Sequence, residues 1–373
     1  MAGIYIHIPF CKKKCHYCDF YFTINHKNII KLIDAIKLEI ELRKKFFTKN
    51  KIDTIYFGGG TPSMINPDLI EEIIKSIFLR FNVSKKIEIT LESNPDDINE
   101  KNILEWKKFG VNRISLGIQT LNNESLKFIN RNHNRSTSLN AIKMLSDNFN
   151  NYSIDLMYGI PKSSLNIFKK DLNEIIKYNP PHISAYNMTI EKRTLFSHWV
   201  KKGIIKVQNE NEKINQFLYL TKFLKKKKYI HYEISNFCKP GCSSKHNTGY
   251  WKRNKYLGLG PSAHSFDGKS RSWNISNNKK YISSINKKVL LNSEEKLSQK
   301  MLINEVIMTG VRTMWGIDNN YLTSNLKYDI LKSQKLMIQK LIKEKLIIVN
   351  KAKIITTKKG ALLSNYISEK LFV

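Results

Sequence analysis

The chain has 373 residues, of which 41% are hydrophobic and 25% are charged, and its formal net charge is +32. This composition excludes a disordered chain and predicts a folded protein of two or three domains. No apolar run of about 18 residues occurs, and no basic stretch precedes an apolar segment at the N-terminus, so we expect a cytoplasmic protein without a membrane span. The lysines are scattered through helical and loop segments, which favours a solvated basic surface over a specific nucleic-acid partner.

Short apolar segments alternate with amphipathic helical patterns along the first half of the chain. Strands are predicted at residues 4–8, 53–57, 87–92, 112–118, 153–159 and 182–188. The clearest helical pattern places an apolar stripe against a sheet through Ile29, Ile33, Ile36 and Ile40. Repeated strand–helix–strand units imply parallel strands with right-handed crossovers, and therefore an α/β fold that is either an open barrel or a doubly wound sheet.

Three of the five cysteines lie in the loop that follows the first predicted strand. Cys11, Cys15 and Cys18 have the spacing C-x3-C-x2-C. Inside a cell, clustered cysteines more often bind metal or do redox chemistry than form disulfides. Three thiolates from one loop suit a cubane cluster of four irons with one iron left open. The alternative is a zinc site completed by a fourth ligand, which could be His7, His16, Cys238 or Cys242.

Polar and glycine-rich groups follow the other predicted strands. The segment FGGGTPS follows the second strand, Glu92 closes the third, Gln119 follows the fourth, and Asp155 lies near the end of the fifth. Because the carboxyl ends of parallel strands meet at one edge, these groups and the cysteine loop are expected to share one site. Taken singly, the glycines could form a simple tight turn, and Glu92 and Asp155 could be solvated strand-end charges.

The cysteine loop and the later GGGTP segment together resemble the radical S-adenosylmethionine (SAM) superfamily. This resemblance implies a partial (β/α)6 barrel in which Cys11, Cys15 and Cys18 hold a 4Fe–4S cluster whose open iron binds SAM. The segments YIHIPFCKKKCHYCDF, YFGGGTPS, ESNPDD, RISLGIQT and DLMYGIP are similar to the oxygen-independent coproporphyrinogen III oxidase group. Matching that group's motifs implies that SAM contacts Tyr5, Tyr17, Gly59, Gly60, Thr61, Glu92, Gln119, Arg131 and Asp155.

Two activities occur in this group: oxidases that decarboxylate porphyrinogen propionates, and a branch described as heme chaperones. The oxidases have a further cysteine where this chain has Phe20, and a substantial segment before their first strand, which here starts at residue 4. HNTGYW, residues 246–251, fits the HNxxYW motif that the chaperone branch carries. The resemblance therefore implies a heme chaperone, with a radical SAM coproporphyrinogen III dehydrogenase as the alternative.

The same resemblance implies that heme is bound through His246, Tyr250 and Trp251. It also implies an electron donor for the cluster and an acceptor protein for the heme, with a membrane as one candidate location of the acceptor. From the residues alone, a histidine before two aromatic residues is more often a packing element. Cys238 and Cys242 are interpreted as buried or incidental thiols. A basic, zinc-containing nucleic-acid-binding module remains a third hypothesis at this stage.

We expect three parts along the chain: a core at residues 1–235, an extension with the HNxxYW motif at 236–290, and a C-terminal domain at 291–373. Helical patterns at 294–315 and 328–345, a hairpin in LIIVNKAKIITT and a helix in KKGALLSNYISEKL predict a mainly helical, winged-helix-like domain. Such domains bind DNA in many proteins and serve as packing modules in others. The resemblance implies no DNA role here.

Overall fold

The computed structural model describes residues 1–47 and 50–373. Six parallel strands lie side by side in chain order, which confirms the predicted α/β fold and favours the open barrel over the doubly wound sheet. All six strands coincide with predicted segments, and they are β1 (Ala2–Ile8), β2 (Ile52–Gly59), β3 (Val83–Ser93), β4 (Arg113–Gln119), β5 (Tyr152–Tyr158) and β6 (His182–Asn187).

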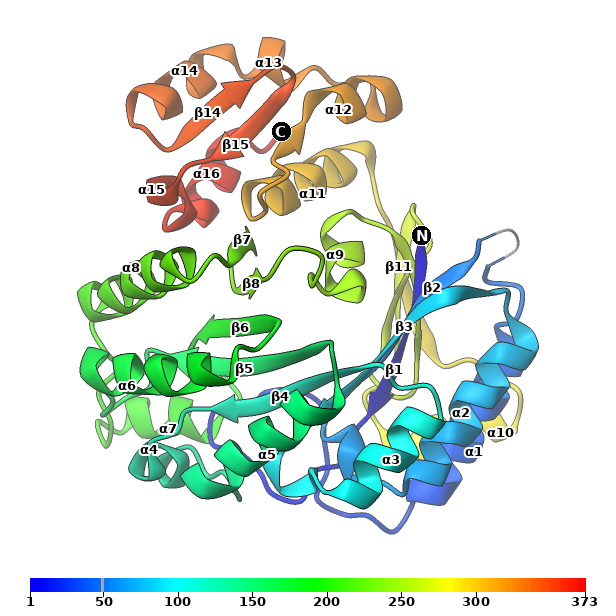
Figure 1. Cartoon of the computed structure of the whole chain (residues 1–373). Coiled ribbons are helices and arrows are strands. Elements are labelled where there is room, and N and C mark those ends of the chain that lie inside the picture. Colours follow the sequence, from blue (N-terminus) through cyan, green and yellow to red (C-terminus); the bar gives the residue numbers. More distant parts are fainter. Residues whose placement is uncertain (48–49) are drawn as a thin grey trace.

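Helices cover the outer face of this curved sheet, as Figure 1 shows. The isoleucine pattern is confirmed in the first of them, where Ile33, Ile36 and Ile40 are fully buried. The connecting helices are α1 (Ile29–Leu42), α2 (Pro67–Arg80), α3 (Glu100–Lys108), α4 (Asn123–Phe128), α5 (Arg135–Asn148), α6 (Leu165–Ile175), α7 (Leu195–Lys201) and α8 (Glu210–Lys226).

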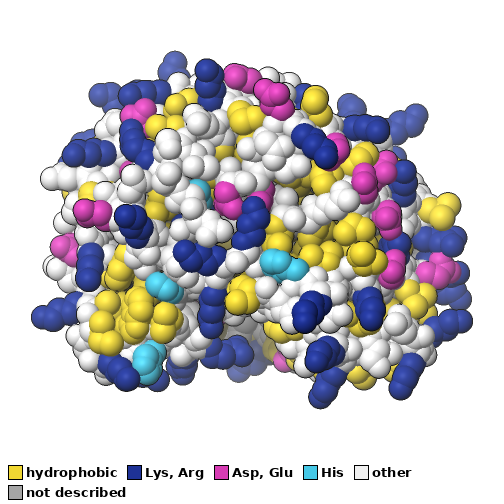
Figure 2. Space-filling view, turned by 90° about the horizontal axis from the view of Figure 1, so that it is seen from below, with side chains coloured by type: hydrophobic (Ala, Val, Ile, Leu, Met, Phe, Trp, Pro, Cys, Tyr) yellow, Lys and Arg dark blue, Asp and Glu magenta, His cyan; other side chains and the backbone are white. Residues whose placement is uncertain are grey.

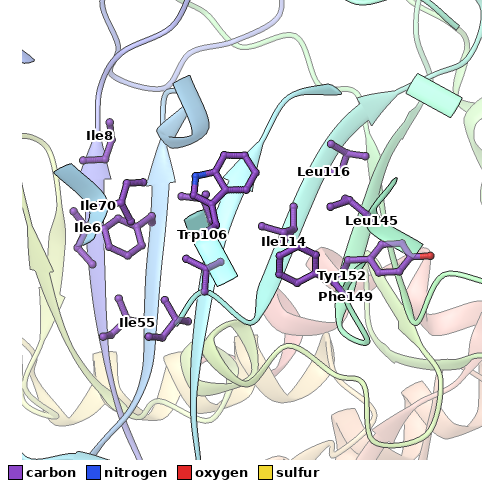
Figure 3. Close-up of a cluster of buried hydrophobic side chains, with 14 of the residues drawn as sticks. Ile6, Ile8, Ile55, Ile70, Trp106, Ile114, Leu116, Leu145, Phe149 and Tyr152 are labelled. Carbon is purple, nitrogen blue, oxygen red and sulfur yellow. The ribbon is translucent and has the colours of Figure 1, made fainter. Parts of the chain in front are cut away.

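The main core lies between the sheet and its outer helices. Figure 3 shows Ile6 and Ile8 of β1, Ile55 of β2 and Ile114 of β4 facing Trp106 of α3 in this layer. Because side chains alternate along a strand, the residues between these isoleucines point to the inside of the barrel. On β1 the inward-facing side chains are Tyr5 and His7, so the polar interior begins with the first strand.

Further strands extend both edges of the barrel into a sheet of twelve strands. On one edge β9 (Lys255–Leu259) pairs parallel to β1, followed by β10 (His264–Phe266), β11 (Ser270–Asn274) and β12 (Asn292–Lys296). On the other edge lie β8 (Asn236–Cys238) and β7 (Ile230–Glu233). Two helices belong to these extensions, α9 (Lys245–Trp251) and α10 (Asn278–Asn286).

The C-terminal segment packs around a hydrophobic cluster of its own, which runs from Ile303 to Leu371. The predicted hairpin is confirmed by β14 (Ile347–Asn350) and β15 (Lys353–Thr356), which pair with each other, and β15 also pairs with the short β13 (Ile317–Asp318). The helices are α11 (Gln299–Val311), α12 (Asn319–Leu326), α13 (Ile330–Ser333), α14 (Lys335–Lys343), α15 (Lys358–Ala361) and α16 (Ser364–Leu371).

Three details of this segment differ from the prediction. The helix expected over residues 328–345 is divided into α13 and α14. The first helix was expected from residue 294, but residues 292–296 form β12, because their backbone pairs with β11. The last helix was expected to be continuous, but it is divided into α15 and α16. Gly360 closes against the carbonyl of Leu346, where a Cβ atom would approach to 2.0 Å, so packing against the hairpin breaks the helix. The boundaries at 235/236 and 290/291 stay predictions.

Basic side chains are spread over the surface. Figure 2 shows lysine and arginine scattered across the face seen from below, without one continuous basic patch. Within residues 1–47 and 50–373, no helix is long and apolar enough to cross a membrane.

Candidate functional site: a cysteine cavity and an aromatic cavity

The cysteine loop follows the carboxyl end of β1, and hydrogen bonds between its own backbone groups hold it in place. Thr23 N donates to the Pro9 carbonyl at 2.7 Å, and Cys11 N donates to the Thr23 carbonyl at 3.0 Å. Farther along, His16 Nδ1 is 2.9 Å from the Phe128 carbonyl, which ties the loop to α4. These hydrogen bonds fix the conformation of a loop that has no regular secondary structure, at the end of the barrel.

Cys11, Cys15 and Cys18 all line a cavity of about 510 Å³ at this end of the barrel, called here the cysteine cavity. Burial raises the pKa of the Cys11 thiol to about 11 and that of the Cys18 thiol to about 12. Polar donors oppose this effect: Thr61 Oγ1 lies 3.6 Å from Cys11 Sγ. A buried thiolate needs such donors or a bound cation, and iron at this place would supply the cation.

The glycine turn brings β2 against the cysteine loop. Gly60 N donates to the Ile8 carbonyl at 2.9 Å, and Thr61 N donates to the Phe10 carbonyl at 2.7 Å. A Cβ atom at Gly60 would meet the Phe10 carbonyl at 2.5 Å, so only glycine permits this approach. The turn thereby places the Thr61 hydroxyl beside Cys11.

The carboxyl group of Glu92 lies against the glycine turn. Glu92 accepts a hydrogen bond from the Tyr56 hydroxyl at 2.8 Å and one from Gly59 N at 3.2 Å. Burial raises the pKa of Glu92 to about 7 in spite of these donors. Two strands and the turn thus hold one carboxyl group at the cavity wall, where it can accept hydrogen bonds from ligand hydroxyl groups.

A buried cation completes the far wall. Arg131 Nη2 donates to Asn94 Oδ1 and to the Gly117 carbonyl, each at 2.6 Å, and its Nη1 lies 3.7 Å from Cys15 Sγ. Its Nε is buried and has no partner among the described residues. Arg131 lines the cavity and brings a guanidinium charge to it, which suits the carboxylate of a ligand.

Serine and aspartate side chains form a polar floor across β4, β5 and β6. Asp155 accepts hydrogen bonds from Ser115 at 2.8 Å and from Ser153 at 2.9 Å. The strand register brings these positions together, since Asp155 pairs with Gly117 on one side and with Ser184 on the other. Burial raises the pKa of Asp155 above its ordinary value.

The cysteine cavity gathers most of the predicted SAM-binding residues. Its lining includes Tyr17, Gly59, Gly60, Thr61, Glu92, Gln119, Arg131 and Asp155. Tyr5 lies elsewhere: it lines the second cavity described below, and its hydroxyl lies 3.2 Å from His7 Nδ1. The assignment of these residues to SAM stays a prediction.

The lining also contains residues that the sequence analysis missed, which include Tyr56, Asn94, Ser115, Met157 and Tyr186. A signal for two of them was present. Tyr56 is two residues from Thr54 and from Gly58 and so shares the inward face of its strand, and Ser115 interrupts an apolar strand. Asn94 and Tyr186 lie at strand ends, where alternation alone does not show which way a side chain points.

The donor set fits a cluster better than a single zinc ion. Within the part of the chain that the structure describes, no three His, Cys, Asp or Glu side chains are gathered closely enough to hold one ion. Two of the four proposed fourth zinc ligands are engaged elsewhere: His7 Nε2 lies 2.8 Å from the Tyr21 carbonyl, and His16 bonds the Phe128 carbonyl. A cubane has its irons at separate corners, so three thiols spread around one cavity suit it.

The HNxxYW motif forms α9, which packs against the amino-terminal halves of β1 and β2. The His246 ring is 3% exposed, and its two nitrogens lie 2.8 Å from Thr54 Oγ1 and 2.9 Å from the Tyr250 hydroxyl. Burial lowers the pKa of His246 to about 3. A neutral, doubly hydrogen-bonded imidazole is therefore built into the wall between α9 and the sheet.

A second cavity of about 770 Å³ lies between the two edges of the sheet and α11, and is called here the aromatic cavity. Tyr250 and Trp251 of the motif line it, but His246 does not. The cysteine cavity and the aromatic cavity share Phe20 and Tyr186 in their linings, so they are neighbours. Of the three residues predicted to bind heme, Tyr250 and Trp251 therefore line the aromatic cavity, whereas His246 lies behind its wall.

Comparisons with known proteins agree with this geometry. Residues 5–175 match the family model of the radical SAM superfamily. The fold is similar to that of coproporphyrinogen III oxidase (HemN) from Escherichia coli, a radical SAM enzyme, with a TM-score of 0.86 and 22% identity over 100% of this chain and 90% of that chain. The cysteine cavity and the barrel around it therefore define a radical SAM protein.

Two curated relatives narrow the family. The heme chaperone HemW of Lactococcus lactis is 32% identical over 371 residues, which cover 99% of this chain and 97% of the relative. The heme chaperone HemW of Buchnera aphidicola from Schizaphis graminum is 39% identical over 264 residues, 70% of this chain and 69% of the relative. The chain belongs to the HemW family. As a radical SAM protein it has a 4Fe–4S cluster and SAM as its cofactors, as the resemblance implied.

Proposed function

We propose that the protein is a heme chaperone, which binds heme and transfers it to an acceptor protein. The observation that carries this proposal is the match to a heme chaperone over nearly the full length of both chains. Phe20 supports it, because the chain has a phenylalanine where the oxidases of the wider group have a further cysteine. Its ring is 69% exposed and lines both cavities.

The cysteine cavity would hold the cofactors. Cys11, Cys15 and Cys18 would bind the cluster, which supplies single electrons when it is bound. Arg131 would pair with the SAM carboxylate, and Glu92 would accept hydrogen bonds from the ribose hydroxyls. The polar floor around Asp155 would keep the rest of SAM oriented, while the glycine turn closes the cavity against the cysteine loop.

Heme reaches this chain as cargo. The family resemblance implies that His246, Tyr250 and Trp251 bind it, and two of these three side chains line the aromatic cavity. We expect the function to require an electron donor for the cluster and an acceptor protein for the heme, both unidentified. The cytoplasmic location expected from the sequence belongs to the same proposal, and so does an acceptor at a membrane.

Reconstitution of the cluster under anaerobic conditions tests the proposed function. The loaded protein should bind heme, release it to an apoprotein heme trap such as apomyoglobin, and make no protoporphyrinogen from coproporphyrinogen with SAM and a reductant. Sustained SAM-dependent decarboxylation would overturn the chaperone proposal in favour of the dehydrogenase. Absence of heme binding by a protein with full iron and sulfide content would overturn it as well.

A further inference from the structure

We propose that heme occupies the aromatic cavity with His264 as the ligand of its iron and Arg312 at a propionate, while His246 acts as a positioning residue for Tyr250. This inference rests on the proposed heme-chaperone function and departs from the assignment of His246 as the iron ligand. It follows from the volume and aromatic lining of the cavity, from the ring nitrogens of His264, which are unpaired within the described residues, and from the arginine side chains that line the cavity.

The aromatic cavity has the size and chemistry for a flat, largely apolar ligand. Its volume of about 770 Å³ lies in the range of cavities that enclose small-molecule ligands. Aromatic side chains supply much of the wall, from several different elements of the fold: Tyr5, Phe20, Tyr21, Tyr186, Tyr250, Trp251, Tyr256 and Phe266. Such rings stack favourably on an extended π-system.

Two histidines line this cavity, and only one of them has free nitrogens. In His7 both nitrogens are engaged, with Tyr5 at 3.2 Å and with the Tyr21 carbonyl at 2.8 Å. Within the described residues, neither ring nitrogen of His264 has a hydrogen-bond partner, and the ring is exposed. It stacks on Trp273 with ring centroids 5.9 Å apart, which orients the imidazole without using a nitrogen.

His246 is poorly placed to ligate iron. Both of its nitrogens are hydrogen-bonded, and the cavity that its ring lines has a volume of only about 10 Å³. A Cβ atom at Gly3 would meet Thr54 Oγ1 at 2.6 Å and the His246 ring at 3.1 Å, so the ring is packed tightly against β1 and β2. Its contact with the Tyr250 hydroxyl fixes a side chain that does line the aromatic cavity.

The propionates of heme need cations, and the wall offers them. Arg312 bonds the Met308 carbonyl and Asn365 but has no acidic partner within the described residues. Partial burial lowers its pKa from the ordinary value, so an anion beside it would stabilise the charge. Arg253 is held by Glu305 at 3.1 Å, yet its Nη1 is buried without a partner.

One acidic residue lines the same cavity. Glu233 is 3% exposed, and its Oε1 has no partner among the described residues. Burial raises the pKa of Glu233 to about 7, so near neutral pH this group is partly protonated.

Glu233 lies on β7, whereas Arg312 follows α11, and the backbone N–H of Ile234 donates to the Arg312 carbonyl at 3.0 Å. The cation that we assign to a propionate is therefore anchored to the sheet edge.

Heme titrations of the reconstituted protein and its variants, followed as difference spectra against the same protein without heme, test the assignment. His264→Ala should shift the Soret band and weaken heme binding by roughly tenfold or more, while iron, sulfide and SAM affinity stay as in the parent. His246→Gln should keep the Soret position of the parent, because the iron ligand is retained. A ligation change in His246→Gln, together with an unchanged His264→Ala, would overturn the inference.

Two ligand analogues separate the parts of the proposal. Metal-free protoporphyrin IX should bind the parent and His264→Ala equally, because the stacking wall is intact in both; selective loss in the variant would mean that His264 shapes the cavity and does not ligate. Arg312→Gln should weaken binding of heme severalfold but not of heme dimethyl ester, and equal weakening of both would remove the propionate contact. If the parent itself binds no heme, the proposed function fails, and that outcome is distinct from any pattern among the variants.

Discussion

The two neighbouring cavities of this protein differ in their lining: one is lined by polar groups that bond one another, and the other largely by aromatic rings. In the cysteine cavity the polar groups are tied to one another: Arg131 to Asn94 and Gly117, and Glu92 to Tyr56. In the aromatic cavity the wall is made largely of rings. Within the described residues its Arg312 bonds Asn365 but has no acidic partner, and the ring nitrogens of His264 have no hydrogen-bond partner. The first is organised before a ligand binds, which suits a resident cofactor, and the second offers groups that a transient cargo can use and release.

The largest expected effect concerns the cluster. Cys15→Ala removes one of three thiols from the cysteine cavity, so the chain should lose stable iron binding on anaerobic reconstitution. Cys242→Ala is the matched control, because this thiol lies in the loop after β8 and bonds only the Pro240 carbonyl. Iron and sulfide assays decide the matter. Equal iron loss in both variants would show that the three-cysteine assignment is wrong.

A smaller effect is expected for the cation of the same cavity. Arg131→Met should lower SAM affinity by roughly tenfold to a hundredfold, because a charged hydrogen bond is worth about 1.5–3 kcal/mol. Cluster content and heme affinity should stay unchanged, which would separate the two cavities experimentally. Arg135→Met, at the start of α5 outside the cavity, serves as the control. Anaerobic calorimetry measures the affinity, and an unchanged value would remove Arg131 from the SAM site.

The third prediction uses the pH dependence of folding. Because the pKa of Glu92 is raised to about 7 in the folded protein, against about 4.5 when unfolded, its stabilising contribution is complete below pH 4.5 and is lost as the pH rises through 7. Relative to Glu92→Gln, the apoprotein should lose roughly 2 kcal/mol of unfolding free energy between pH 5 and 8. Denaturant unfolding at several pH values measures this difference. Parallel pH profiles for parent and variant would contradict the raised pKa.

The last prediction, similar in size to the third, tests the packing behind the aromatic cavity. Gly3→Ala should destabilise the fold by about 1–3 kcal/mol, since its methyl group would crowd Thr54 and His246. Gly249→Ala lies on α9 and meets only Asn254, at 3.6 Å, so it should be neutral or slightly stabilising. Urea unfolding compares the two variants. Equal stability of Gly3→Ala and the parent would mean that the His246 ring is not tightly held.

The barrel could be predicted from the sequence because each strand carries its own signal. Apolar alternation located all six strands, and parallel order brought the cysteines, Glu92, Gln119 and Asp155 to one edge. Local patterns do not carry information about distant contacts, and the assignment of Tyr5 to SAM came from the family resemblance alone. Tyr5 and His7 share the inward face of β1, but only the position of α9 and β9 beside this strand shows which cavity they line.

The HNxxYW motif shows the same limit more clearly. HNTGYW predicts a ligand by its histidine, but the helix turns His246 towards Thr54 and turns Tyr250 and Trp251 towards the aromatic cavity. The sequence suggests His264, with His231, only as a second choice after His246 and gives no signal for Arg312, and both line one cavity because β10 and the end of α11 lie beside it. A site assembled from such distant segments has no local signature.

Simultaneous loading tests the two-cavity account most directly. The reconstituted protein is first saturated with heme and then titrated anaerobically with SAM, while calorimetry reports SAM binding and the Soret band reports retained heme. The account predicts that SAM binds with the same stoichiometry as in the heme-free protein and that heme stays bound. Release of one heme for each SAM bound would contradict it, because both ligands would then compete for a single cavity.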